Sequence, residues 1–137
     1  MAGTFLDTNI LLYAVDAKAP VAKRKRARDL RDRHFKDGTG AISTQVLQEF
    51  FVNATRRLGL PAALVRDQVE ELRRMTLIQV TPQLILDAID LHRLSRVSFW
   101  DALVLRAAKA AGCGQVLTED LNAGQVFDGV KVVNPFE

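Results

Sequence analysis

The chain has 137 residues, 48% hydrophobic and 26% charged, and these ordinary globular values exclude collagen-like, disordered and mucin-like proteins. We expect one domain spanning residues 1–137, in the cytoplasm and without a membrane partner. No apolar run approaches the roughly 20 residues of a membrane span, and the N-terminus resembles no secretory signal. Lysine and arginine total 19 against 16 acidic residues, and two histidines with one cysteine do not suffice for a structural zinc site.

Strand-like and helix-like segments alternate along the chain. In chain order we expect a strand at 3–7, helices at 9–15 and 20–36, a strand at 41–43, helices at 44–58 and 61–76, a strand at 77–81, helices at 82–95 and 99–112, and strands at 115–118 and 131–134. This alternation predicts an α/β fold with a mainly parallel sheet. In such folds, functional sites form beyond the carboxyl ends of the strands.

The second expected helix is strongly basic. Between Lys18 and Lys36 there are nine basic residues and two acidic ones, which suits a polyanionic partner such as RNA. A solvated helix face is the alternative explanation for this stretch. The candidate RNA contacts are Lys23, Arg24, Arg28 and Arg31.

Two carboxylates follow the first two expected strands. Asp7 lies among apolar residues, where a bare carboxylate is costly unless it is paired, hydrogen-bonded or bound to a metal. Capping of the next helix by Asp7 or Thr8 is the alternative. Glu49 lies about one turn inside a helix among large apolar residues, and taken alone it is better explained as a residue of the polar face.

Two further carboxylates lie in the second half of the chain. Asp101 shares the inward face of a helix that is apolar nearly all round, although it also stands where a capping partner of Ser98 is expected. Asp120 follows the strand at 115–118, where an ordinary acidic turn is the alternative. Trp100, beside Asp101, is expected to pack into the protein rather than to stack on a base.

Together the four acids imply a shared site at one edge of the sheet. Clustered carboxylates repel each other and need cations to stay ionised at neutral pH. All-oxygen ligands suit Mg²⁺ or Mn²⁺, and carboxylate-held divalent ions serve in phosphodiester hydrolysis. The sequence therefore indicates a metal-dependent phosphodiesterase.

Four short motifs resemble those of PIN-domain ribonucleases, and most closely the VapC-like toxins of type II toxin–antitoxin pairs. These motifs, Phe5–Asn9, Gln48–Phe50, Phe99–Ala102 and Leu117–Asp120, occur in order and with suitable spacing along the whole chain. The resemblance implies a three-layer α/β/α fold with a five-stranded sheet in the order 3-2-1-4-5.

The resemblance also implies roles for individual residues. Asp7, Glu49, Asp101 and Asp120 would hold Mg²⁺ or Mn²⁺, Asn9 would orient Asp7, and Thr118 would line the pocket with Thr8 in support. The adjacent Glu119 leaves open which of the last two acids reaches the metal. An RNA substrate cut to 5′-phosphate and 3′-hydroxyl ends, a cognate antitoxin and a homodimer are the expected partners and products.

Two other functions are compatible with the same fold class. An aspartyl phosphotransferase or receiver-like domain also places an aspartate after its first strand, but it usually needs a lysine near the last strand, and Lys131 begins that strand rather than ending it. A non-catalytic RNA-binding module is the other alternative, although uncompensated acids would repel RNA.

Overall fold

The computed structural model describes residues 2–137. The strands are β1 (Thr4–Leu6), β2 (Gly40–Ser43), β3 (Thr76–Ile78), β4 (Gln115–Leu117), β5 (Val126–Phe127) and β6 (Val130–Val133). The helices are α1 (Thr8–Val15), α2 (Val21–Asp37), α3 (Thr44–Arg56), α4 (Ala62–Leu72), α5 (Pro82–Ser95) and α6 (Phe99–Ala110). Strands and helices alternate as predicted, which gives an α/β fold.

The strands form one sheet in the order β3-β2-β1-β4-β6-β5. Its first five strands in this order are parallel neighbours and confirm the predicted order, with β6 in the place of the expected fifth strand. The sixth strand, β5, was not predicted, and it pairs antiparallel with β6 at the edge. Asp128 and Gly129 connect the two strands with φ angles of 49° and 86°, as a tight two-residue hairpin requires.

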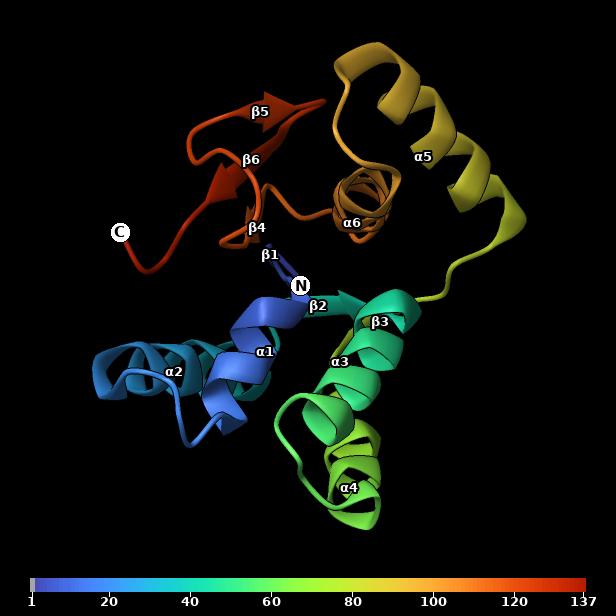
Figure 1. Ribbon diagram of the computed structural model, residues 1–137. Helices are drawn as coiled ribbons and strands as arrows, with labels where there is room; N and C mark the ends of the chain where they lie inside the picture. Colours follow the sequence, from blue (N-terminus) through green and yellow to red (C-terminus); the bar gives the residue numbers. More distant parts are fainter. Residues whose placement is uncertain (1) are drawn as a thin grey trace.

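Helices cover both faces of the sheet, as expected for a three-layer fold. Figure 1 shows α1 to α4 on one side and the α5–α6 pair on the other. The buried core contains all of β1 together with most of α6, whose apolar residues are covered nearly all round. Among residues 2–137, no helix is long and apolar enough to cross a membrane.

Three helices begin at the predicted capping residues. The side chains of Ser43, Thr81 and Ser98 accept hydrogen bonds from backbone amides in the first turns of α3, α5 and α6. The helix predicted at 61–76 ends earlier, at Leu72, because the chain turns there and Thr76 already belongs to β3.

The central strands β1, β2 and β4 are parallel neighbours, so their carboxyl ends lie at the same edge of the sheet. Asp7 directly follows β1, α3 directly follows β2, and Thr118 directly follows β4. The topology therefore brings together segments that are more than a hundred residues apart in the chain.

Candidate active site

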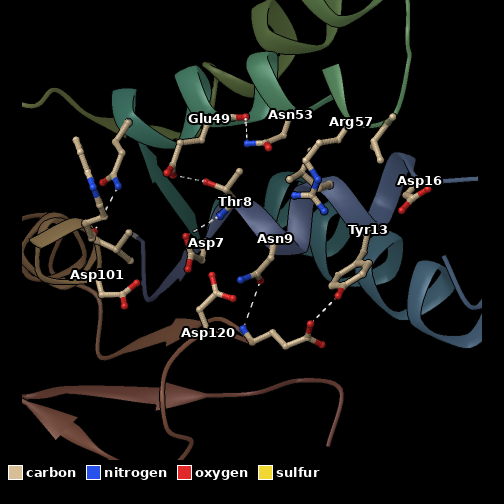
Figure 2. A pocket seen from close by; sticks show the side chains of 16 residues that line it. Asp7, Thr8, Asn9, Tyr13, Asp16, Glu49, Asn53, Arg57, Asp101 and Asp120 are labelled. Atoms are coloured by element: carbon tan, nitrogen blue, oxygen red, sulfur yellow. Dashed lines mark hydrogen bonds between the residues drawn. The ribbon is translucent and has the colours of Figure 1, made fainter. Parts of the chain in front are cut away.

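A pocket of about 270 Å³ opens at this edge of the sheet. Residues from α1, α3, α6 and the segment after β4 line it, and Figure 2 shows how their side chains surround one space. The lining includes all four acids that the sequence singled out: Asp7, Glu49, Asp101 and Asp120. They come from four separate segments of the chain.

Asp7 is the most buried of these acids, with 5% of its surface exposed. Its Oδ1 accepts a hydrogen bond from the Thr8 amide at 2.8 Å, and its Oδ2 accepts one from the Thr118 hydroxyl at 2.7 Å. Burial raises the pKa of Asp7 to about 6 against the opposing effect of both hydrogen bonds, and the negative charges of Asp120 and Glu49 add to the rise. Asp7 also caps α1, so the capping explanation describes part of its role.

Thr118 and Asn9 connect Asp7 to the segment that carries Asp120. The fully buried Thr118 hydroxyl donates to Asp7 and accepts from the Asp120 amide at 3.1 Å and from Asn9 Nδ2 at 3.3 Å. Asn9 Oδ1 in turn accepts from the Glu119 amide at 3.4 Å. This network fixes the chain after β4 relative to Asp7, and it gives Thr118 and Asn9 supporting positions.

Glu49 enters the pocket from α3. The Thr8 hydroxyl donates to Glu49 Oε1 at 2.9 Å, which joins the two sides of the pocket. Asn53 and Arg57 follow Glu49 at intervals of four residues, so they share its helix face and line the same pocket. Arg57 is the cationic residue of this lining, and Figure 2 shows it on the opposite side of the pocket from Asp101.

Asp101 occupies the first turn of α6 and is half-buried. Its amide donates to the Ser98 hydroxyl at 3.1 Å, so Ser98 is the capping residue of α6. Burial raises the pKa of Asp101; hydrogen bonding with Ser98 lowers it and the negative charge of Asp120 raises it further. The exposed Asp120 thus acts electrostatically on both Asp7 and Asp101.

Glu119, the neighbour of Asp120, is held in a different environment. Its carboxylate forms a 2.5 Å ion pair with Lys23 and accepts a 2.5 Å hydrogen bond from the Tyr13 hydroxyl. Burial raises the pKa of Glu119, but Lys23 and Tyr13 outweigh this effect and the net pKa is lowered. The charge of Glu119 is thus largely neutralised, which favours Asp120 as the free acid of this segment.

The chemistry of the donor set suits a hard divalent cation, because all four side chains offer carboxylate oxygens. Figure 2 shows the carboxyl groups of Asp7, Asp101 and Asp120 turned toward the same space. Nevertheless, no three histidine, cysteine, aspartate or glutamate side chains within residues 2–137 are grouped closely enough to hold a metal ion as they stand. Metal binding here would require the acidic side chains to move closer together.

The basic helix α2 uses several of its cations within the protein. All four candidate RNA contacts have intramolecular partners: Lys23 pairs with Glu119, Arg24 and Arg28 donate to the carbonyls of Ala17 and Ala14, and Arg31 pairs with Asp32. Lys25, Arg26, Arg33 and Lys36 are exposed on the same helix. Some cations of α2 therefore bind groups within the protein, and others are exposed to solvent.

The pocket also contains residues that sequence reasoning did not assign to a site. Gln45 and Trp100 line it, and 61% of the Trp100 surface is exposed, contrary to the expectation that this residue packs inside. Asn53 could have been predicted from the sequence, because a residue four positions after Glu49 lies on the same helix face. The placement of Gln45 and Trp100 depends on how α3 and α6 approach each other, which sequence spacing does not reveal.

Comparisons with known proteins identify the family. A family model described as the PIN domain matches residues 4–127. No protein of curated function matches the sequence significantly.

Solved structures share the fold. VapC20 of Mycobacterium tuberculosis, described as a sarcin–ricin loop cleaving toxin, superimposes with a TM-score of 0.66 at 22% identity, over 86% of this chain and 92% of that one. A toxin–antitoxin complex from Klebsiella pneumoniae gives 0.70 at 19% identity, over 98% and 99% of the two chains. DNA-bound VapBC from Salmonella typhimurium gives 0.68 at 20% identity, over 96% and 97%. With the family model covering nearly the whole chain and VapC toxins among the structures of the same fold, the chain belongs to the PIN-domain family.

Proposed function

We propose that this protein is an endoribonuclease that depends on Mg²⁺ or Mn²⁺ and serves as the toxin of a toxin–antitoxin pair. The observation that carries the proposal is the convergence of Asp7, Glu49, Asp101 and Asp120, from four chain segments, on one pocket. The raised pKa of the buried Asp7 shows that its charge is poorly compensated by the protein alone. A bound cation would supply the missing compensation.

The proposed roles follow from the contacts of each residue. Asp7, Asp101 and Asp120 would hold the cation, and Glu49 would complete the site directly or through water. Asn9 and Thr118 fix the position of the Asp120 segment relative to Asp7, and Thr8 orients Glu49. When bound, a divalent cation supplies Lewis-acid activation for phosphodiester hydrolysis.

RNA is the proposed substrate because divalent cations held by carboxylates serve in phosphodiester hydrolysis, and one structural neighbour is described as a toxin that cleaves the sarcin–ricin loop. Arg57 lies at the pocket and is exposed, so it is placed to contact a phosphate beside the scissile bond. Lys23, Arg24, Arg28 and Arg31 remain proposed contacts along the RNA backbone, where they would exchange their present partners for phosphates.

An antitoxin is the proposed protein partner. Several structural neighbours are toxin–antitoxin complexes, and some of them are bound to DNA. An exposed apolar groove between α3 and α4, formed by Leu47, Phe51, Val52 and Val69, supports binding of a protein segment. A short reading frame beside the gene would identify the antitoxin. We also propose that the protein forms a homodimer.

The test of the enzymatic proposal is a cleavage assay on structured RNA. The protein should cut RNA in Mg²⁺ or Mn²⁺, leave 5′-phosphate and 3′-hydroxyl ends, and stop when EDTA is added. Asp7→Asn should remain folded and lose cleavage, because the substitution keeps the shape but removes the ligand charge. Full activity of Asp7→Asn, or cleavage that persists in EDTA, would refute the assignment.

The structure gives little support to a receiver-like phosphotransferase. Lys131 pairs in register with Gln115 at the start of β4, at the end of the sheet opposite Asp7. A lysine there is remote from an acceptor aspartate. The second candidate is a non-catalytic RNA-binding module. It is favoured by the spacing of the acids, because no three of them within residues 2–137 lie close enough together to hold a metal ion. RNA binding without cleavage in the same assay would establish it.

A further inference from the structure

Trp100 has an unusual position for the sole tryptophan of the chain. Its neighbours on α6 from Ala102 to Leu105 are buried in the core, yet 61% of the Trp100 surface is exposed. The residue directly precedes Asp101 and lines the acidic pocket. A large apolar surface left in water at the edge of a polar pocket has no stabilising role in the isolated chain, which suggests that a ligand covers it.

One contact restrains the indole, and another fixes the backbone that carries it. Its ring lies edge-to-face against Phe99, with centroids 5.1 Å apart and planes inclined by 75°. The Trp100 carbonyl accepts a hydrogen bond from Gln45 Nε2 at 3.3 Å, which ties the start of α6 to α3. These restraints reduce the side-chain entropy that is lost when a flat ligand stacks on the exposed part of the ring.

Gln45 supplies a second observation that points to a ligand. This residue is 5% exposed and lines the pocket, and its Oε1 accepts no hydrogen bond within the described chain. A buried acceptor without a donor is destabilising. A hydroxyl or amino group of a bound molecule would satisfy it after a small shift of the side chain.

We propose that Trp100 stacks on one unpaired base of the RNA, next to the bond that is cleaved, and thereby selects single-stranded or looped RNA; this inference rests on the proposed ribonuclease function. Every base offers a flat face for stacking on an aromatic ring. A base inside a duplex has both faces occupied by its neighbours and must leave the stack to reach such a ring. Since Asp101 follows Trp100, the phosphate of the stacked nucleotide enters the pocket among the carboxylates.

The single tryptophan makes the test direct, because tryptophan fluorescence, excited where Tyr13 does not absorb, reports on Trp100 alone. In Mg²⁺, and with the Asp7→Asn variant so that the RNA stays intact, a single-stranded RNA oligonucleotide should quench the fluorescence, and a fully paired duplex of the same sequence should do so much less. In Mg²⁺, Trp100→Leu should raise the KM for a looped RNA about tenfold with a small effect on kcat, whereas Trp100→Phe should retain most of the affinity. Leu94→Ala, which alters another exposed apolar side chain on α5, is the matched control and should change neither value.

The outcomes separate this inference from the proposed function. Cleavage by the wild type, with no quenching in Asp7→Asn and no rise in KM for Trp100→Leu, would overturn the stacking role and leave the ribonuclease intact. Failure of the wild type to bind or cleave any RNA would overturn both. Light scattering adds a third outcome: if Trp100→Leu lowers the oligomeric mass and regains wild-type KM at concentrations that restore it, Trp100 is a contact between copies and the stacking role is wrong.

Discussion

Replacing Asp7 by asparagine should stabilise the metal-free protein at neutral pH. The pKa of Asp7 is about 6 in the folded protein, against 3.8 for an aspartate in the unfolded chain, so the folded state binds more protons between these two pH values. Its stability therefore falls as the pH rises through this window, and above the folded pKa the ionised Asp7 costs about 3 kcal/mol relative to a neutral side chain. An asparagine at this position does not have this cost.

Part of that gain is lost through hydrogen bonding. The Asp7 carboxylate accepts from both the Thr8 amide and the Thr118 hydroxyl, whereas an asparagine has one acceptor oxygen and turns its NH₂ group toward the other donor. Losing one such bond costs about 1 kcal/mol, so the net stabilisation of Asp7→Asn should be about 2 kcal/mol at pH 7.5. The advantage should disappear near about pH 4.5, where the wild-type carboxyl is mostly protonated.

Urea unfolding in EDTA at a series of pH values measures this directly. Asp67→Asn is the matched control, because Asp67 is exposed on α4 and its substitution should change the unfolding free energy by less than about 0.5 kcal/mol. If Asp7→Asn is no more stable than the wild type at pH 7.5, and both lose stability equally between pH 4.5 and 7.5, the burial of an uncompensated charge at Asp7 is refuted.

Three further predictions follow from the same structure. Millimolar Mg²⁺ should raise the melting temperature of the wild type by several degrees and that of Asp101→Asn by less. Without metal, Asp101→Asn should be at least as stable as the wild type, because it removes one of the repelling charges. A less stable variant would indicate that Asp101 acts mainly as a structural cap. Lys23→Met should lower the unfolding free energy by up to about 1 kcal/mol, because it breaks the pair with Glu119, and an unchanged urea midpoint would contradict that role. Arg28→Ala should flatten the log–log dependence of RNA affinity on salt by about 0.7, as expected for one lost phosphate contact, whereas an unchanged slope would place the RNA elsewhere.

Local signals in the sequence account for most of the fold. Capping residues and apolar periodicity predicted the helices, and the alternation of strands and helices predicted the parallel sheet. The edge strand β5 was missed although Asp128-Gly129 is a typical hairpin dipeptide, because the two residues that precede it are too few to show an alternating pattern.

The site was only partly predictable for a different reason. The acids could be placed at one sheet edge because strand order fixes where parallel strands end. Whether Glu119 or Asp120 is free depends on the approach of Lys23 and Tyr13 from other elements, and the exposure of Trp100 depends on how α6 meets α3. Such contacts between distant segments leave no periodic trace in the sequence.

The central claim is that the four carboxylates form a single cation site. The most direct test is an anomalous-difference map from crystals of the protein grown with Mn²⁺. We expect a peak in the pocket, within bonding distance of oxygens of Asp7 and of at least one of Asp101 and Asp120, with those side chains drawn closer together than in the metal-free protein. A map with no peak in this pocket, or with manganese bound only at other residues, would contradict the claim.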